Sequence, residues 1–376
     1  MKRPVRFILS ALLISAVWFA LNTAAATAST ATEPAAQAPV SLSDYFKSTD
    51  WVAERANNAK FVIVDTRSAT DYAKGHIHGA INIPRNKFYF SRTQINGKIF
   101  AYDIPTAAEL VDILTNNGIT PDTTVVAYDT DTSSYGGRFP WVLRVYGHEK
   151  SYVIDGGADK WKDVDHGAWD NATVTPTPSE IPYKIAGYNN HRINKGDLAA
   201  VIDTDNDNKT VEGYVISDVR TPSEYTGFAT TVVSGTQSGG VWNVSTTPFI
   251  YQSAAGARPG HIPYAKFSDY ASDAYTDYLD AGGLPVASTL QASHNVQVLK
   301  SEAALRAHFE SLGITSDKIV YNYCEGGFRS GVYTLILLGL GYPEVYNYDG
   351  SWNEWSLQPG GLYPVAKGDS RDGSKP

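Results

Sequence analysis

The sequence repeats itself once, and this duplication constrains the fold more than any other feature of the chain. Asp65 and Asp218 end similar hydrophobic runs and lie 153 positions apart. Each is followed by an arginine two residues later, by a tyrosine, and by a Gly-His-Ile segment. The later parts of the two copies also match: Thr124–Tyr128 with Ile319–Tyr323, Asp129 with Cys324, and residues 147–161 with 341–355. The chain therefore contains two copies of one domain.

Within each copy, short β-branched runs alternate with longer helical patterns. Ala107–Asn116 precedes the run 125–127 in the first copy, and 302–312 precedes 319–321 in the second. This alternation predicts an α/β protein whose two domains each form a mainly parallel sheet flanked by helices. The expected boundaries are 42–180 for the first domain, 181–190 for a linker, 191–365 for the second domain and 366–376 for a C-terminal tail.

The N-terminus has the pattern of an export signal. Lys2, Arg3 and Arg6 precede an apolar run at 7–21, and small residues follow it. We expect a signal peptide at 1–28, cleaved near residue 26 or 28, a disordered leader at 29–41, and a periplasmic or secreted protein. The alternative is an uncleaved membrane anchor, although a spanning helix needs about 20 apolar residues.

Composition excludes two classes of partner. The net charge of −8, without a basic cluster, argues against nucleic acid. The eight histidines form no ligand-spaced cluster and there is one cysteine, so no metal site is expected. Asp203, Asp205 and Asp207 alternate as in a calcium loop, but Asn208 and Tyr214 stand where that loop needs glycine and glutamate. We interpret the three aspartates as a solvated turn.

Cys324 is the single cysteine, so no internal disulfide can form. It follows the hydrophobic run Ile319–Tyr323 and precedes a glycine-containing turn that leads into a helical pattern. At such a position free backbone N–H groups and the positive end of a helix dipole stabilise a thiolate. Cys324 is therefore the candidate nucleophile, at the strand end where ligands bind in parallel sheets.

Three segments carry a family resemblance: residues 75–84 (GHIHGAINIP), 324–330 (CEGGFRS) and 345–355 (VYNYDGSWNEW). With them, residues 42–365 resemble a tandem-domain rhodanese, of the thiosulfate and 3-mercaptopyruvate sulfurtransferase family. The resemblance implies that Cys324 takes a sulfane sulfur from a donor, becomes a persulfide, and passes the sulfur to an acceptor. No other cofactor is implied. With no second cysteine in the chain, the acceptor must be external.

The resemblance also implies a set of substrate-binding residues. The active-site loop supplies the cradle for the persulfide, with Gly326 and Gly327 giving it the freedom to turn N–H groups inward; its members are Glu325, Gly326, Gly327, Phe328, Arg329 and Ser330. The Arg329 guanidinium either binds an anionic donor or forms a surface salt bridge at the helix start. Arg220 resembles a position near the substrate in tandem relatives, whereas an Asp-Xaa-Arg pair present in both copies is more typical of structural hydrogen bonding.

Asp129 replaces the cysteine in the first copy, which predicts an inactive first domain. The donor, thiosulfate or 3-mercaptopyruvate, stays open, because Glu325 and Gly326 match neither the cationic loops of the first type nor the Gly-Ser loops of the second. The acceptor is expected to be cyanide or a thiol, including a protein thiol, with no membrane partner after signal cleavage.

Two other functions are alternatives to sulfur transfer. Phosphatases of a related fold place five residues between cysteine and arginine, and here there are four. A non-catalytic envelope binding or sulfur-sensing module is the second alternative.

The uncharged insertion 226–257 is either a hairpin at the active-site rim, with Phe228, Trp242, Phe249 and Tyr251 contacting substrate, or a surface excursion.

Overall fold

The computed structural model describes residues 40–90, 93–95, 98–100, 103–131, 134–188, 191–203, 209–233, 241–248, 257–291 and 294–368. The helices and strands of the first copy are η1 (Leu42–Asp44), β1 (Phe46–Lys47), α1 (Thr49–Ala53), β2 (Phe61–Asp65), α2 (Ala69–Lys74), β3 (His76–Ile77), β4 (Ile81–Asn82), η2 (Arg85–Lys87), β5 (Thr93–Ile95), β6 (Lys98–Phe100), α3 (Ala107–Asn116), β7 (Thr124–Tyr128), α4 (Ser134–Val145), β8 (Ser151–Ile154), α5 (Gly157–Asp159), η3 (Lys160–Val164) and β9 (Trp169–Asp170).

Those of the second copy are β10 (Arg192–Ile193), α6 (Lys195–Ala200), β11 (Ile202–Asp203), β12 (Lys209–Thr210), β13 (Tyr214–Asp218), α7 (Pro222–Thr226), β14 (Phe228–Val233), β15 (Val241–Pro248), β16 (Lys266–Phe267), α8 (Tyr270–Ala274), β17 (Tyr275–Asp277), β18 (Gln297–Leu299), α9 (Glu302–Ser311), β19 (Ile319–Tyr323), α10 (Phe328–Gly339), β20 (Val345–Tyr348) and α11 (Ser351–Trp355).

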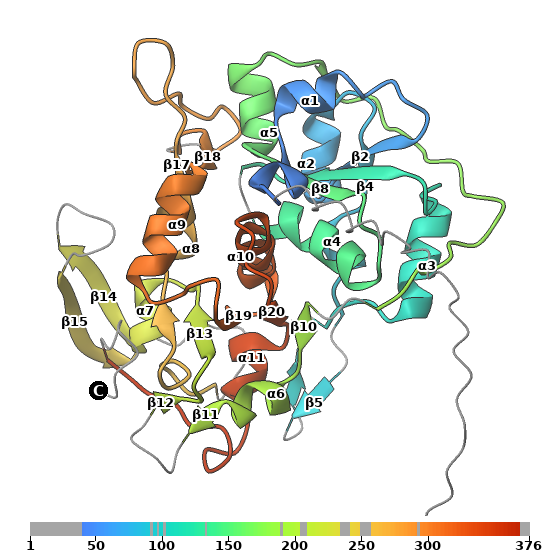
Figure 1. The fold of residues 1–376 in the computed structure, drawn as a ribbon. Coiled ribbons are helices and arrows are strands. Elements are labelled where there is room, and N and C mark those ends of the chain that lie inside the picture. The colour runs from blue at the N-terminus through green and yellow to red at the C-terminus, as the bar shows by residue number, and fades with distance from the viewer. Residues whose placement is uncertain are drawn as a thin grey trace, which may run out of the picture. The chain divides into compact units, whose positions relative to one another are not determined.

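Two five-stranded sheets form the frame of the molecule (Figure 1). The strand order is β1-β8-β7-β2-β4 in the first copy and β10-β20-β19-β13-β16 in the second. All pairings in both sheets are parallel. Because matching strands occupy matching places, the predicted duplication and the α/β fold with two parallel sheets are confirmed.

The register of the central strands fixes where Cys324 lies. In the first sheet Asp65 lies opposite Tyr128, and in the second Asp218 lies opposite Tyr323. The next residue along β7 is Asp129 and the next along β19 is Cys324. Both therefore lie at the carboxyl edge of their sheet, where parallel α/β proteins place their ligands.

The predicted helices begin where their capping residues lie. The side chain of Thr106 accepts from the N–H of Glu109, and Glu109 bonds back to Thr106, which starts α3 at the predicted residue. The side chain of Ser301 accepts from the N–H of Ala304 at the start of α9, and that helix ends at Ser311, one residue before the predicted end. Capping hydrogen bonds thus set the start of both helices.

One hydrophobic cluster extends across both copies. Helices α4 and α10 lie side by side between the sheets (Figure 1). A Cβ atom on Gly137 would lie 2.3 Å from a methyl carbon of Val332, and one on Gly331 would lie 3.5 Å from the Trp141 ring. The glycine at position 137 lets the helices approach closely, whereas a Cβ atom at position 331 would be in ordinary contact with the ring; Trp141 and Leu335 are buried in the resulting cluster.

Several expectations concern residues outside this description. The signal peptide, the alternative membrane anchor and leader residues 29–39 lie outside the described residues, as do Asp205 and Asp207, and Phe249 and Tyr251 of the insertion. Within the insertion, β14 and β15 pair antiparallel, as a hairpin requires, and lie beside α7 (Figure 1). No helix in the described ranges is long and apolar enough to cross a membrane.

The expected linker and the expected tail differ in their backbone structure. Residues 171–188 contain no helix or strand, and β10 starts the second copy at Arg192. The tail expected at 366–376 begins in a paired segment, since Ala366 and His261 exchange backbone hydrogen bonds and the N–H of Gly368 donates to the carbonyl of Thr226. The second domain therefore extends at least to Gly368.

Candidate active site

Cys324 lies between β19 and α10, and its side chain is buried, with 1% of the residue exposed. Its own N–H donates to Ser351 Oγ at 3.1 Å, and its carbonyl accepts from the N–H of Trp352 at 3.0 Å. The N–H of Gly327 donates to Cys324 Sγ at 3.1 Å. The sulfur therefore faces a backbone donor at the start of a twelve-residue helix, as the sequence predicts.

The backbone of Gly327 takes a conformation that favours glycine. Its φ is +79°, in the left-handed region, and it caps α10. A Cβ atom there would lie 2.6 Å from the carbonyl oxygen of Asp349 and 2.7 Å from Arg138 Nη1. Asn347 Nδ2 donates to the Gly327 carbonyl at 2.9 Å, and Ser330 Oγ donates to Asn347 Oδ1 at 2.7 Å. The loop is thus held from below by β20.

Phe328 packs the other side of the loop against the first copy. Its ring contacts those of Tyr89 and Tyr135 edge to face, with centroids 5.5 Å and 4.9 Å away. Arg85 lies over the Tyr135 ring at 4.4 Å. Residues of the first domain therefore line one side of the loop that follows Cys324.

Arg329 forms an ion pair inside the second domain. Its Nη1 and Nη2 donate to the two carboxylate oxygens of Glu224, both at 2.9 Å, and Glu325 Oε2 lies 4.0 Å away. Burial by itself would raise the pKa of Glu224, but the adjacent Arg329 lowers it to about 2. Of the two interpretations of Arg329, the structure favours the salt bridge, and this bridge is largely buried rather than on the surface.

Arg220 is also occupied by a carboxylate. Its guanidinium pairs with Asp218 at 2.6 Å, donates to the Gly260 carbonyl at 2.8 Å, and lies 4.4 Å from the Trp352 ring. It is almost completely buried, with 1% exposed. This placement favours the structural interpretation of Arg220.

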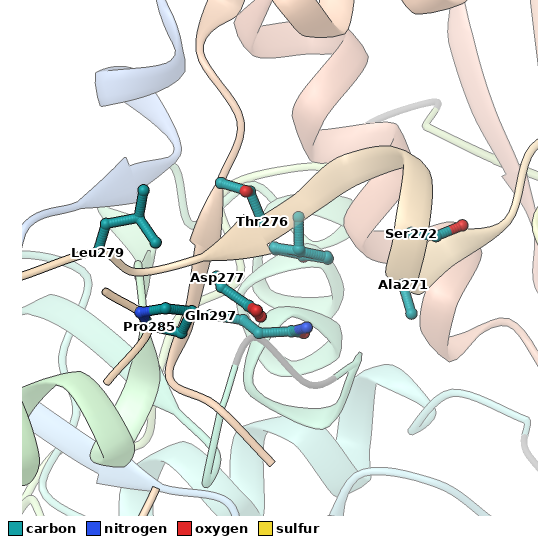
Figure 2. A pocket seen from close by; sticks show the side chains of 8 residues that line it. Ala271, Ser272, Thr276, Asp277, Leu279, Pro285 and Gln297 are labelled. Atoms are coloured by element: carbon teal, nitrogen blue, oxygen red, sulfur yellow. The ribbon is translucent and has the colours of Figure 1, made fainter. Parts of the chain in front are cut away.

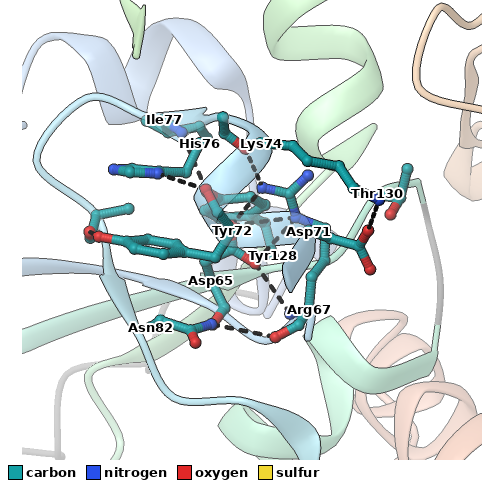
Figure 3. Close-up of polar contacts among 12 residues, drawn as sticks. Asp65, Arg67, Asp71, Tyr72, Lys74, His76, Ile77, Asn82, Tyr128 and Thr130 are labelled. Carbon is teal, nitrogen blue, oxygen red and sulfur yellow. Dashed lines mark hydrogen bonds and ion pairs between the residues drawn. The ribbon is translucent and has the colours of Figure 1, made fainter. Parts of the chain in front are cut away.

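The first copy repeats this network around Arg67 (Figure 3). Arg67 pairs with Asp65 at 2.5 Å and donates to the Gly75 carbonyl at 2.8 Å, and Tyr128 donates to Asp65 at 2.7 Å. In the second copy Tyr323 donates to Asp218 at 2.5 Å. A network present beside both Asp129 and Cys324 supports the fold and does not distinguish an active copy.

The histidines of the two Gly-His-Ile segments are equivalent as well. His76 stacks on Tyr72 with ring centroids 3.7 Å apart, and His261 stacks on Tyr225 at 3.8 Å. Each Nδ1 contacts the carbonyl of its stacking tyrosine, at 2.9 Å and 2.8 Å. Burial lowers the pKa of His261 to about 4. These contacts agree with the structural role expected for both histidines.

Asp129 shares one backbone contact with Cys324 but has a different chemistry. Its carbonyl accepts from the N–H of Ala158 at 2.9 Å, and its Oδ1 accepts from the N–H of Thr130 at 2.6 Å. Nearby, burial and the charges of Asp131 and Asp163 raise the pKa of Asp159 to about 7. The first-copy counterpart of the Cys324 loop is therefore a group of carboxylates.

Four residues at this site were not singled out from the sequence: Glu224, Asn347, Asp349 and Ser351. Glu224 belongs to a Thr-Pro-Ser-Glu capping box, a recognisable pattern whose second partner, Arg329, is 105 residues away. The other three lie inside the 345–355 segment that carried the family resemblance. The 345–355 segment is the sequence signal that points to these three residues, but a sequence motif does not show which residues they contact.

The described part of the chain also has a cavity away from these residues. It measures about 450 Å³ and lies at α8, β17 and β18 (Figure 2). Its lining residues are Ala271, Ser272, Tyr275, Thr276, Asp277, Leu279, Pro285 and Gln297. None of the predicted site residues is among them. In the described ranges no group of three or more His, Cys, Asp or Glu side chains could hold a metal ion.

Comparison with known proteins gives one consistent result. The family model of the rhodanese-like domain matches residues 48–164 and 197–358. A thiosulfate sulfurtransferase of Pseudomonas aeruginosa is 28% identical over 82% of this chain and 92% of its own length. The sulfur carrier protein TtuD of Thermus thermophilus is 30% identical over 86% of this chain and 96% of its own.

Solved structures show the same fold. The crystal structure of YnjE aligns with a TM-score of 0.64 at 20% identity, over 88% of this chain and 70% of that one. The wild-type structure of EanB aligns with a TM-score of 0.64 at 21% identity, over 88% and 70%. At these identities the likeness concerns the fold alone.

Proposed function

The chain belongs to the rhodanese family, with two rhodanese-like domains, and is a sulfurtransferase, and on this basis we propose that it carries sulfur as a persulfide on Cys324. The observation that carries this proposal is the Gly327 N–H, which donates to Sγ at 3.1 Å at the N-terminus of α10. A donor and a helix dipole at that place stabilise negative sulfur, both in the thiolate and in the persulfide.

The proposed reaction has two transfer steps. The Cys324 thiolate attacks the outer sulfur of thiosulfate, a new S–S bond forms, and the donor's S–S bond breaks with its electron pair leaving on sulfite. With 3-mercaptopyruvate the C–S bond breaks instead, and the carbon takes a proton to give pyruvate. Cyanide or a thiolate then attacks the terminal sulfur of the persulfide and releases the Cys324 thiolate. No further cofactor takes part in either step.

We propose Gly326, Gly327, Phe328 and Ser330 as the cradle of the persulfide, because the loop is fixed by Asn347 and by its contacts with the first domain. Arg329 and Glu325 contribute charge at its edge. Since Glu224 neutralises Arg329 by a two-point contact, a dianionic donor gains less there than beside an unpaired arginine. This contact leaves both donors as candidates.

The first domain is proposed to be inactive in transfer, because Asp129 offers a carboxylate where the second copy has a thiol. The N-terminal sequence supports export to the periplasm or the outside, where the acceptor is cyanide, a small thiol or a protein thiol. Small-molecule donors and acceptors agree with the names of the relatives.

Intact-mass measurement tests the proposal. The mature protein is incubated with thiosulfate and, separately, with 3-mercaptopyruvate. We expect a gain of one sulfur atom that cyanide or a thiol removes, and no gain in Cys324→Ser, which should lose at least about a thousandfold in turnover while remaining folded. Retained turnover in Cys324→Ser would contradict the mechanism, and no adduct with either donor would contradict both donor assignments.

A further inference from the structure

Arg138 belongs to α4 of the first copy, yet its guanidinium contacts the loop that follows Cys324. Its Nη1 lies 2.7 Å from Asp349 Oδ1 and donates a long hydrogen bond, 3.5 Å, to the Gly326 carbonyl. The guanidinium carbon lies 4.4 Å from the centre of the Phe328 ring. Arg138 is fully buried and Asp349 is 1% exposed. The inactive domain therefore places a buried positive charge directly behind the active-site loop.

One peptide unit joins this charge to the sulfur. A trans peptide points its carbonyl and its N–H in opposite directions. In the unit between Gly326 and Gly327, the carbonyl faces Arg138 and the N–H donates to Cys324 Sγ. A cation at the carbonyl polarises the amide and makes its N–H a stronger donor. The effect of Arg138 thus reaches the sulfur through a single amide.

The surroundings hold Arg138 in this position. Asp349 follows β20 and also accepts from the N–H of Ile104 at 3.2 Å, while Arg192 Nη2 lies 3.4 Å from its Oδ2. Gly327 fits against both Arg138 and Asp349, since a Cβ atom would lie within 2.7 Å of each. The carboxylate therefore fixes the arginine, and the arginine fixes the peptide.

We propose that Arg138 is a positioning residue for sulfur transfer, through which the first domain orients and polarises the Gly326–Gly327 amide toward the sulfur of Cys324. This rests on the proposed persulfide function of Cys324. It gives the inactive copy a part in the reaction: its helix α4 supplies the positive charge that faces the Gly326 carbonyl, while Arg192 of the second copy contacts the other oxygen of Asp349. The catalytic residue is still Cys324.

The test uses Arg138→Met and the double variant Arg138→Met/Asp349→Asn in the mature two-domain protein. The single variant removes one of the two arginines that pair with the buried Asp349 carboxylate, so it is expected to lose stability. The double variant removes both charges and is expected to recover part of that stability, but not the support of the amide. Ultraviolet absorbance of the thiolate is followed against pH, with each variant's own Cys324→Ser form subtracted. This readout needs neither donor nor turnover.

In both variants the thiolate signal should appear about one pH unit higher than in the parent protein. The single-turnover rate of persulfide formation should fall about tenfold at neutral pH. Arg138→Lys should restore part of both, because an ammonium group retains the charge. Arg329, whose charge also interacts with Cys324, and Glu325, which lies 4.0 Å from Arg329, are unchanged in all variants.

Arg144→Met is the matched control on the same helix. Arg144 donates to the carbonyls of Ser151 and Asp44 and pairs with Glu149, all in the first copy. It should lower stability and leave the thiolate profile and the rate unchanged. A double variant with the parent's thiolate profile and rate would overturn the role of Arg138. Failure of the parent protein itself to form a persulfide would instead overturn the proposed function.

Discussion

The two copies of the domain share their frame and differ in the loop after the central strand. Both have the same strand order, the same buried Asp-Arg pair and the same stacked histidine and tyrosine. After that common frame, one copy presents Asp129 and the other Cys324. The same frame therefore accommodates either a carboxylate or a thiol, and the chemistry of each copy depends on the side chains of the loop and of the residues that contact it.

The same sequence position also takes different partners in the two copies. Asp71 is the third residue of α2, and Glu224 is the third residue of α7, each bonded to its N-cap side chain. Asp71 pairs locally with Lys74 at 2.8 Å and is half exposed. Glu224 is buried and holds Arg329 of the active-site helix. A capping residue in one copy has become a support of the site in the other.

The largest effect is expected for Gly327→Ala. Alanine must adopt a φ near +79° and place its Cβ atom 2.6 Å from a backbone oxygen that cannot move freely. We expect a loss of about 4 kcal/mol in the free energy of unfolding and about a hundredfold loss of sulfur transfer, measured by urea unfolding and by cyanide-dependent turnover.

Gly79→Ala is the control for this change in the first copy. Gly79 has a φ of +77°, and a Cβ atom there would meet nothing within 4 Å. It should cost about 1 kcal/mol and leave activity unchanged. Equal losses of activity in both variants would show that the effect is one of global stability and not of the loop.

Glu224→Gln should have the next largest effect. The amide keeps the shape of the side chain but leaves Arg329 without its carboxylate, so a loss of about 3 kcal/mol in the free energy of unfolding is expected. Asp71→Asn, at the equivalent exposed position, should cost about 0.5 kcal/mol or less. Similar costs at the two sites, measured by urea unfolding, would contradict the distinction between them.

The pH dependence of this pair follows from the lowered pKa of Glu224. Its folded pKa of about 2 lies below the ordinary value of 4.5. The stabilisation is therefore present above pH 4.5 and is lost as the pH falls toward 2. Glu224→Gln should lack this acid-dependent loss, which unfolding curves between pH 5 and pH 2 would detect.

The smallest effect is expected for Asp159→Asn. Burial, together with Asp131 and Asp163, raises the pKa of Asp159 from 3.8 to about 7. The folded state then binds the proton more tightly, so stability falls as the pH rises from about 4 to 7. Asp159→Asn removes this pH-dependent loss, so it should gain stability relative to the parent between pH 5 and pH 8, which thermal unfolding at the two pH values would measure.

Asp273 gives the corresponding test in the second copy. Burial, with the charge of Asp269, raises its pKa to about 7 as well. Asp273→Asn should therefore change the pH dependence of thermal unfolding in the same direction. An unchanged profile in both variants would show that neither carboxyl is protonated in the folded protein near neutral pH.

Sequence reasoning reached the fold because repetition and periodicity are local properties of the chain. The sequence predicts the starts of α3 and α9 and the placement of Cys324 between a strand and a helix, since capping residues and hydrophobic runs act over a few residues. The Asp-Xaa-Arg pairs were interpreted as structural because both copies have them, and their contacts agree.

The interactions around the loop could not be derived in this way. The sequence leaves two roles open for Arg329, donor binding or a salt bridge. Its buried partner, Glu224, favours the salt bridge and is 105 residues away. The sequence assigns no role to Arg138, which lies against Gly326, 188 residues later. No local pattern encodes such pairs, because they exist only after the two sheets have packed through α4 and α10.

The sequence by itself determined two copies of a parallel α/β domain and one thiol at a strand end, because periodicity, capping and residue identity act along the chain. The tertiary structure alone decided which carboxylates neutralise Arg329 and Arg138 and which domain supports the loop. The physical reason is that an ion pair depends on distance and burial, and packing sets both. The sequence thus identifies Cys324, and the tertiary structure determines which residues surround it.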